Sequence, residues 1–310
     1  MSTTPSRGVL HSETLPDHLH PPAAVHIDLD GARHIFQVHG WRYSAKDDPL
    51  FETGVRNALD FLGANELRAT FFVIVEDLED PRKRELIAEA ARHGHEIASH
   101  SLTHRNLTAL NSDEKRREIF ESRERLAARL GVEVRGFRAP VFSLDRESLE
   151  LVNAAGYAYD SSVFPSPEFA RRIGVARLDT APHAPLPECE MIELPMPAYQ
   201  PLPVPFHPSY SLVLGSWYFR WGLKRFRALR APFILLFHLT DFSDPLPADR
   251  LPNWKARLFT LSHLSAAGKL RRCEKMIHLV QRHFRVADTS SLLAEAHSGL
   301  RERARKMTSL

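Results

Sequence analysis

Carboxylate and imidazole side chains occur in this sequence at spacings that suit a metal-dependent hydrolase. AVHIDLDG carries Asp28 and Asp30 one residue apart, and SHSLTH carries His100 and His104 four positions apart. Alternate residues of a strand face the same side, so both aspartates are expected to point together while Leu29 packs. One carboxylate and two imidazoles, completed by water, are a recurrent coordination set for zinc or a similar divalent ion.

Two further side chains with catalytic potential follow apolar runs. RAPVF contains Arg138, and FILLFHLTD contains His238. Each candidate has an ordinary explanation when taken singly: an aspartate that caps a turn, a chance pair among 17 histidines, a surface ion pair or a buried histidine. All of them nevertheless fall where a strand is expected to end. Sites of parallel α/β proteins assemble at the carboxyl ends of their strands.

The elements that would position these residues alternate regularly. The alternation predicts parallel strands covered by helices, in a barrel or an open doubly wound sheet. Strands are expected at 24–30, 69–75, 95–101, 136–140, 157–162, 191–196 and 232–241, and helices at 51–67, 81–94, 112–131 (with Ser112 as a cap), 145–156, 210–230 and 262–283. The segment RHIFQVHGWRY after the first strand is expected to be a loop.

The chain is predicted to form one large domain. Residues 1–22 are expected to be a flexible N-terminal arm, 23–296 a single α/β domain and 297–310 a C-terminal helical tail. The stretch 163–209 contains eleven prolines and is interpreted as an insertion that crosses one face of that domain.

Composition narrows the class of protein. The chain is 43% hydrophobic and 25% charged, as in an ordinary globular protein, and its net charge of +3 argues against nucleic acid as the main partner. Cys189 and Cys273 form no CxxC pair, so neither a disulfide framework nor a zinc knuckle is expected. Neither a signal peptide nor a membrane-spanning apolar run is recognisable, which predicts a cytoplasmic location. The oligomeric state is not predicted.

Several motifs together resemble one known family. HIDLDG, ATFFVI, GHEIASHSLTH, GFRAPVFS and GYAYDSSVFP span residues 23–165, and PFILLFHLTD follows later. This set resembles the polysaccharide deacetylase family, also called NodB-homology or carbohydrate esterase family four, in which HSLTH fits the H-[ST]-x-x-H metal motif. The resemblance implies a distorted (β/α) barrel of about seven strands.

The resemblance also implies roles for the candidate residues. Asp30, His100 and His104 would hold one divalent metal ion, usually Zn²⁺, with Co²⁺, Ni²⁺, Fe²⁺ or Mn²⁺ as alternatives. Asp28 would be the base that takes a proton from metal-bound water, Arg138 would pair with that base, and His238 would protonate the leaving amine. Substrate-binding or supporting positions are expected at Asp160, Pro140, Phe142 and, from its place after the first strand, Trp41.

Two features depart from the common family pattern. Most members carry adjacent aspartates, whereas Leu29 separates them here, as in a branch with peptidoglycan deacetylase-like and allantoinase-like enzymes. YDSSVFP replaces the usual tryptophan-rich motif. Residues 190–245 resemble the extension of deacetylases that occur near exopolysaccharide and sugar-transfer genes, which points to glycan assembly.

The expected activity is N-deacetylation of an amino sugar in a polysaccharide, an oligosaccharide or a lipid-linked glycan precursor. One alternative is hydrolysis of another carbon–nitrogen amide bond, as in allantoinase-like or deformylase-like enzymes. A second is a glycosidase that uses Asp28 and Asp30 as its carboxylate pair, although this leaves His100 and His104 without a role. A third is a catalytically silent member of the fold.

The segment 210–230 interleaves aromatic and basic residues. A basic helix with an aromatic face can lie in a membrane interface, which would suit a protein peripheral to the inner membrane and a lipid-linked substrate. An aromatic stripe at helical spacing can equally be part of the core.

Overall fold

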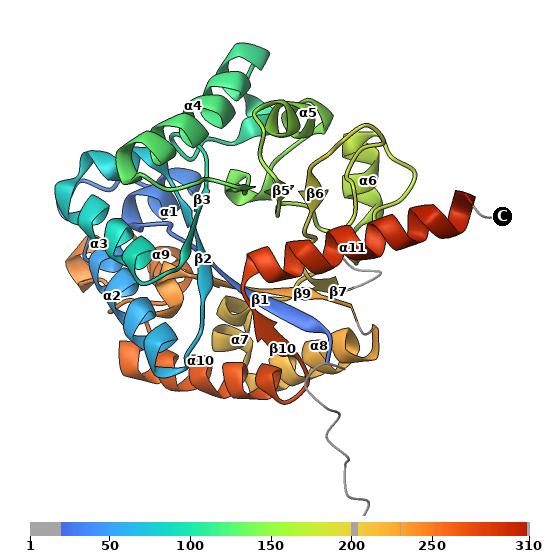
Figure 1. Ribbon diagram of the computed structural model, residues 1–310. Coiled ribbons are helices and arrows are strands. Elements are labelled where there is room, and N and C mark those ends of the chain that lie inside the picture. The colour runs from blue at the N-terminus through green and yellow to red at the C-terminus, as the bar shows by residue number, and fades with distance from the viewer. Residues whose placement is uncertain (1–19, 200–203, 230, 309–310) are drawn as a thin grey trace, which may run out of the picture.

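The computed structural model describes residues 20–199, 204–229 and 231–308, and its main feature is one curled parallel sheet (Figure 1). Eight strands belong to this sheet, seven of them in the spatial order β9, β1, β2, β3, β4, β5, β6, while β10 pairs with the first part of β1. Their bounds are β1 Pro22–Asp28, β2 Ala69–Val73, β3 Glu96–Ser99, β4 Gly136–Phe137, β5 Tyr159–Asp160, β6 Ile192–Glu193, β9 Phe233–His238 and β10 Arg285–Ala287. No ladder joins β6 to β9 within the described residues, so the distorted barrel expected from the motifs is confirmed as an open curl.

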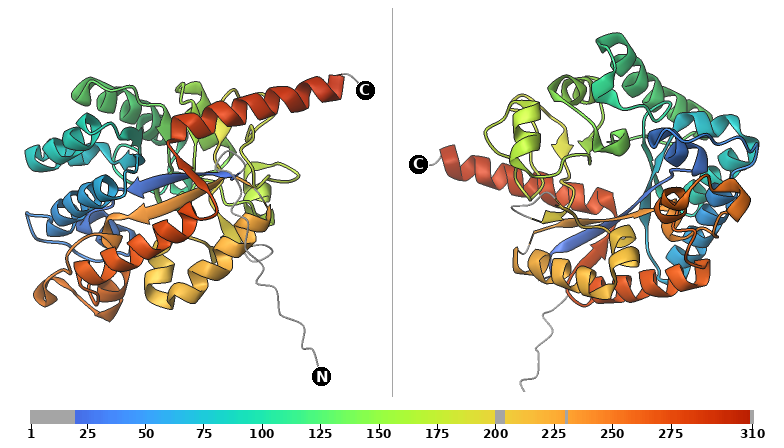
Figure 2. Two further views of the ribbon diagram at one scale, coloured as in Figure 1. Left: turned by 60° about the horizontal axis from the view of Figure 1, so that its bottom comes forward. Right: turned by 180° about the vertical axis from the view of Figure 1, so that it is seen from behind.

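Helices surround the outer face of this sheet (Figure 1). The last of them, α11, projects beyond the body of the molecule (Figure 2). The helices are α1 Ala32–Val38, α2 Pro49–Ala64, α3 Pro81–Arg92, α4 Ser112–Leu130, α5 Arg146–Ala154, α6 Pro167–Ile173, α7 Pro208–Leu214, α8 Ser216–Leu229, α9 Trp254–Phe259, α10 Ala266–Gln281 and α11 Thr289–Thr308, and a small antiparallel pair joins β7 Ala198–Tyr199 to β8 Val204–Pro205.

The core lies between the sheet and these helices. Within it, β1 is paired with neighbouring strands along its length and is almost entirely buried. β1 pairs with β9 along Ala23–Asp28 and with β2 along Val25–Asp28, and every residue after Pro22 is buried. A strand covered on both faces needs the nearly continuous apolar run that this segment has. The two polar side chains that it does bury, His26 and Asp28, therefore need partners inside the barrel.

A tight turn after β1 directs the chain across the open end of the barrel. The Asp48 side chain accepts hydrogen bonds from the backbone N–H groups of Ala32 and Phe51 and so joins the starts of α1 and α2. At Gly31 an added Cβ would lie 2.1 Å from an Asp48 carboxylate oxygen. Only glycine allows this close approach, and the turn leaves Asp30 directly above the strand end.

Several sequence-based boundaries are corrected by the structure. The first strand is 22–28 rather than 24–30, so Asp30 lies beyond it, and the segment expected to be a loop forms the helix α1. The N-cap of α4 is Asn111 rather than Ser112, because Asn111 and Glu114 form a capping box. The single helix expected over 210–230 is two helices, separated at Gly215, whose φ is 98°.

The proline-rich stretch contributes to the main sheet, because its strand β6 pairs with β5. Most of the expected N-terminal arm, residues 1–19, lies outside the described residues, and α11 begins at Thr289, before the predicted boundary at 297. Both cysteines are free. Among the residues described, no helix has the length and apolar character needed to cross a bilayer.

Candidate functional site

The candidate residues meet at the carboxyl ends of four strands. Asp28 ends β1, His238 ends β9, and His100 and Arg138 directly follow β3 and β4. Because β9, β1, β2, β3 and β4 are consecutive in the sheet, their ends form one rim of the curl. The sequence-based expectation of a shared level is therefore matched by the geometry.

Three side chains converge on one point of this rim. Ligand atoms of Asp30, His100 and His104 all lie within 4.8 Å of one another. Oδ1 of Asp30 is 2.9 Å from Nε2 of His104 and 3.6 Å from Nε2 of His100. Oδ1 of Asp30 and Nε2 of His104 are buried and form an ion pair with each other when His104 is protonated. Both atoms become available as ligands once His104 gives up that proton.

The ring orientation of His100 is set by the backbone. Its Nδ1 lies 2.9 Å from the carbonyl oxygen of Arg138. A carbonyl only accepts, so Nδ1 carries the proton and Nε2 keeps its lone pair toward Asp30. A donor on the outer nitrogen of a ligating histidine is the usual way in which proteins fix its tautomer.

The pKa values of Asp30, His100 and His104 are shifted in different directions. Burial by itself would raise the pKa of Asp30, but His104 and His100 outweigh it and hold that pKa well below its ordinary value. Burial lowers the pKa of His100, whereas the Asp30 carboxylate outweighs burial at His104 and raises its pKa. The group therefore offers an ionised carboxylate and a neutral imidazole in a largely dry setting.

Arg138 is fully buried beside Asp28. Its Nη1 donates to Oδ1 of Asp28 at 2.6 Å, and its Nε donates to the carbonyl oxygen of Ser161 at 2.7 Å. Its Nη2 lies 2.8 Å from Nδ1 of His26, which must accept because guanidinium has only donors. Burial, followed by the Arg138 charge, lowers the pKa of His26 well below its ordinary value, so this histidine is neutral.

His238 approaches Asp28 from the other side. Its Nε2 lies 4.0 Å from Oδ2 of Asp28, and its side chain is 21% exposed, more than that of any other member of the site. Its Nδ1 lies 3.2 Å from the hydroxyl of Ser209, which donates to Oδ2 of Asp241 at 2.9 Å. The same carboxylate oxygen accepts the backbone N–H of His238.

The sequence pattern did not identify Ser209 and Asp241 as candidate site residues. Asp241 stands in the FHLTD run and could have been noticed from its spacing to His238. Ser209 lies among the prolines that end the predicted insertion, where no periodicity marks it. Asp241 is fully buried, and burial raises its pKa although His238 opposes the shift.

The loops that carry the site have unusual backbone angles. Among the described residues other than glycine, six have positive φ, and four of these lie in the site loops: Ser101, His104, Val141 and Phe142. A β-branched residue such as Val141, with φ 48°, is a clear outlier. Such strain occurs preferentially where function constrains the chain.

The remaining predicted residues lie at varied places. Asp160 accepts from the backbone N–H and the hydroxyl of Ser162, whose oxygen in turn accepts the backbone N–H of Ala139, so it supports the segment after Arg138. Burial raises the pKa of Asp160 and raises that of neighbouring Glu193 well above its ordinary value.

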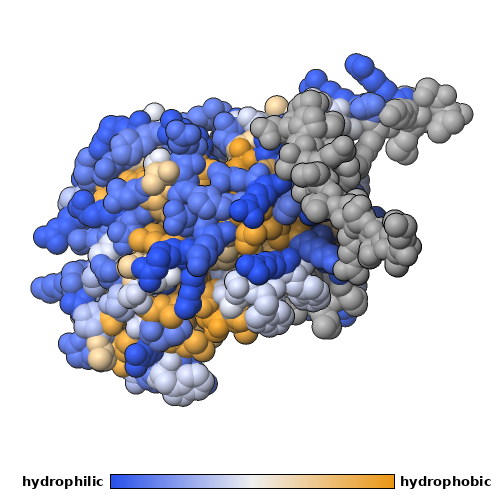
Figure 3. All heavy atoms as spheres, turned by 90° about the horizontal axis from the view of Figure 1, so that it is seen from below, coloured by the Kyte–Doolittle hydropathy of each residue, from blue (hydrophilic) through white to orange (hydrophobic). Residues whose placement is uncertain are grey.

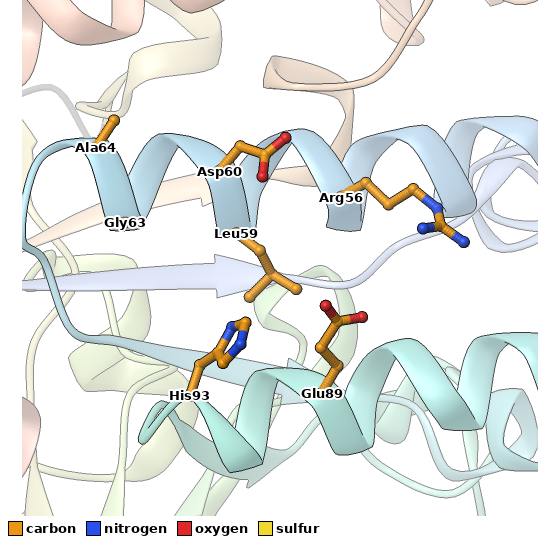
Figure 4. Close-up of a pocket in the computed structure, with 7 residues that line it drawn as sticks. All are labelled: Arg56, Leu59, Asp60, Gly63, Ala64, Glu89 and His93. Atoms are coloured by element: carbon orange, nitrogen blue, oxygen red, sulfur yellow. The ribbon is translucent and has the colours of Figure 1, made fainter.

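Pro140 and Phe142 form a turn beside Arg138, with the Phe142 ring 5.9 Å from the guanidinium carbon. Trp41 instead packs on His39, Phe36 and Phe259, which ties α1 to α9. A surface pocket between α2 and α3, lined by Arg56, Asp60, Glu89 and His93 among others, involves none of the residues at the strand ends (Figure 4).

Comparison with known sequences places this geometry in context. Residues 44–159 match the polysaccharide deacetylase family. That segment includes His100, His104 and Arg138, whereas Asp28, Asp30 and His238 lie outside it. A chitooligosaccharide deacetylase of Rhizobium leguminosarum bv. trifolii is 37% identical over 70 residues, which are 23% of this chain and 32% of that protein. A peptidoglycan-N-acetylglucosamine deacetylase of Bacillus cereus is 33% identical over 82 residues, 26% of this chain and 29% of that protein. The chain thus spans less than a third of the length of either relative.

Solved structures resemble the whole chain. A protein of Mycobacterium smegmatis described as a polysaccharide deacetylase superposes with a TM-score of 0.61 at 20% identity and covers 96% of both chains. Puue allantoinase superposes with the same TM-score at 16% identity and covers 96% of this chain and 98% of its own. At these identities the likeness concerns the fold.

Proposed function

We propose that this chain, which matches the polysaccharide deacetylase family over residues 44–159, is a metal-dependent hydrolase that removes an acyl group, in particular acetyl, from the nitrogen of an amino sugar. The observation that carries the proposal is the convergence of Asp30, His100 and His104 next to the Asp28–Arg138 pair and His238. The names of the two bacterial relatives point to acetylated amino-sugar glycans as the substrate class.

The three converging side chains fit a divalent cation. Two of their ligand atoms, Oδ1 of Asp30 and Nε2 of His104, are buried and face each other at 2.9 Å, and the third belongs to a histidine whose tautomer leaves its lone pair inward. One carboxylate oxygen and two imidazole nitrogens suit Zn²⁺, with Co²⁺, Ni²⁺, Fe²⁺ and Mn²⁺ as alternatives. When bound, such an ion would act as a Lewis acid toward the acyl oxygen and would make water a stronger acid.

Asp28 is the base in this proposal. Its Oδ1 is engaged by Arg138, so Oδ2 remains to take a proton from the attacking water. The guanidinium holds the carboxylate in one orientation and compensates its charge in a buried place. The Asp28–Arg138 contact thus places a cation beside the two neighbouring aspartates.

His238 is the acid. An amide nitrogen leaves readily only once it is protonated, and an imidazole can supply the proton near neutral pH. Its partly exposed side chain can be reached by a substrate, and the hydroxyl of Ser209 at Nδ1 holds the ring with Nε2 toward Asp28. Asp241 fixes Ser209 and the backbone of His238 at once, so it positions the acid without touching the substrate.

Other predicted residues would contact or support the substrate side. Pro140 and Phe142 form a wall next to Arg138, and Asp160 braces that wall through Ser162 and Ala139. Trp41 would contribute only to the far edge, because its ring is engaged by α1 and α9.

The test is a screen of acetylated amino sugars with the metal-replete protein. Polymeric, oligomeric and lipid-linked substrates would be scored by acetate release, and each active reaction would be repeated after treatment with a chelator and after re-addition of Zn²⁺. Loss with chelator and recovery with metal are expected. If no acetylated sugar yields acetate but the protein opens the ring of ureides or releases formate from a formylated amine, the other amide hydrolases are favoured. No turnover of any substrate would favour a silent protein.

A further inference from the structure

The outward face of α8 combines tryptophan with basic residues. Trp217 is 63% exposed and Trp221 is 56% exposed. Arg220 and Lys224 are also exposed, and spacings of three and four residues place them on the same face of the helix. The opposite face enters the core through Tyr218, Phe219, Leu223 and Phe226. The aromatic residues of this segment therefore divide into a core face and a surface face.

The preceding helix extends this surface. On α7, Tyr210 is 41% exposed, and Val213 and Leu214 are each 46% exposed. We call these three residues together with Trp217, Arg220, Trp221 and Lys224 the docking face. Seen from below, the molecule shows hydrophobic side chains intermixed with hydrophilic ones rather than one continuous apolar area (Figure 3).

The stretch of sequence that carries the docking face is basic. The sequence contains no acidic residue between Glu193 and Asp241. At the end of α8, Arg227 lies close enough to α10 to act on His283, whose pKa is lowered by burial and then by Arg227, His20 and Arg282. Arg227 thus adds a positive charge near the end of α8.

We infer that the docking face binds the surface of a bilayer that contains anionic lipid. Tryptophan and tyrosine favour the headgroup level of a bilayer, and short aliphatic side chains beside them reach the acyl boundary. Lysine and arginine near the surface are attracted by anionic headgroups. Intermixed aromatic and basic residues, on a stretch of sequence without acidic residues, match this occupant in both polarity and charge.

The docking face also leads to the candidate site. The Tyr210 ring lies 4.4 Å from that of His207, which lies 5.2 Å from the ring of His238. Ser209, in the first turn of α7, contacts His238 directly. If the proposed function holds, the substrate is an acylated amino sugar carried on a membrane lipid, because α7 places the candidate acid next to the bilayer surface.

The experiment measures vesicle binding without substrate. The full-length protein would be sedimented with phosphatidylcholine vesicles that contain or lack phosphatidylglycerol, at low and high salt. Binding only to the anionic vesicles, weakened by salt, is expected. Arg220→Glu and Lys224→Glu should each weaken it by about fivefold or more, and Trp217→Ala should weaken it and reduce the blue shift of tryptophan emission, to which Trp221 also contributes.

The matched control is Trp254→Ala with Lys255→Glu. Trp254 is 70% exposed on α9, and Lys255 is its exposed basic neighbour. This variant should bind as the wild type does. The inference is overturned if the wild type stays in the supernatant, if zwitterionic vesicles bind it equally, if the control loses as much binding as the α8 variants, or if a polyanion such as heparin binds it while anionic vesicles do not.

Activity separates this inference from the proposed function. The α8 variants should deacetylate a short soluble oligosaccharide as the wild type does and should lose activity only toward a vesicle-borne acylated sugar. A protein that binds vesicles but releases no acetate refutes the enzymatic proposal and keeps the docking face. An active enzyme whose vesicle binding is unaffected by all α8 variants refutes the docking face alone.

Discussion

Replacement of the buried Asp28–Arg138 pair tests two ideas together. One is that Asp28 is the catalytic base, and the other is that each side chain compensates the buried charge of its partner. The two side chains are 1% and 0% exposed, and Nη1 of Arg138 lies 2.6 Å from Oδ1 of Asp28. Removal of either partner leaves an uncompensated buried charge, which costs about 3–5 kcal/mol of folding free energy. Three variants are needed: Asp28→Asn, Arg138→Met and the double variant.

The two single variants should lose different amounts of folding free energy. In Asp28→Asn the guanidinium keeps its hydrogen bonds to the carbonyl and hydroxyl oxygens of Ser161 and to His26, so the loss should be near the lower end of that range. Arg138→Met leaves the carboxylate without a cation and the Ser161 carbonyl and His26 without a donor, so its loss should be near the upper end. The double variant buries no unpaired charge of this pair and should lose less than the sum.

Urea unfolding of the four proteins gives the coupling free energy, and acetate release gives the effect on activity. Loss of the base should lower kcat by about 10²–10⁴-fold. If Arg138 acts only through Asp28, the double variant should be no less active than Asp28→Asn. The exposed pair Arg172–Glu168, 3.2 Å apart, provides a control whose coupling should stay within about 1 kcal/mol.

Two results would refute this reasoning. Wild-type acetate release by Asp28→Asn would exclude Asp28 as the base. Additive losses of stability, with no coupling between the two substitutions, would show that the contact at 2.6 Å does not compensate the two buried charges.

Two further predictions concern single carboxylate and imidazole groups. His238→Asn should lower amide hydrolysis by about 10²–10⁴-fold but reduce cleavage of an acetyl ester with a good leaving group much less, because that oxygen leaves without a proton; equal losses on both substrates would contradict the acid role. Glu193→Gln tests how the free energy of unfolding depends on pH. Burial and neighbouring Asp160 raise the pKa of Glu193 well above 4.5. The wild-type free energy of unfolding is therefore undiminished by this group below pH 4.5 and falls as pH rises toward the folded-state pKa. The variant should lose less stability between mildly acidic and mildly alkaline pH in urea unfolding, and identical slopes for both proteins would show that Glu193 does not titrate in this way.

The strand ends of the site could be predicted because two simple rules agree there. Apolar runs of strand length bounded by polar residues marked β1, β3, β4 and β9, and parallel strands bring their carboxyl ends to one rim. Asp28 and His100 could thus be placed together although they lie far apart in the sequence. The exact ends of the strands could not be predicted from the sequence pattern. Asp30 continues the two-residue alternation of side chains in β1, although the hydrogen-bonded pairing of β1 stops at Asp28.

The surroundings of His238 could not be predicted from pattern. Ser209 reaches it from α7, whose position depends on the path of a proline-rich stretch without periodicity. The segment 210–230 posed a different problem, because aromatic residues occur on both sides of α8 and composition does not say which side is covered. Contacts with Phe206 and Phe233 identify Phe226 as core, whereas Trp217 remains outside.

Contacts of the chain with itself hold the three candidate ligands in place. His104 has a left-handed backbone with φ 57°, and its N–H donates to the hydroxyl of Ser101, which is left-handed as well with φ 69°. The His100 ring is held by the Arg138 carbonyl, and the turn after Asp30 is held by Asp48. Strained residues of this kind cost of order 1–3 kcal/mol each and persist only where neighbours enforce them. None of these restraints uses the ligand atoms of the three side chains, so the curled sheet and its loops contribute to the arrangement through other atoms. Residues 70 positions apart could be expected in one site because each follows a strand whose carboxyl end lies at the same rim, and because the motifs resemble those of one family.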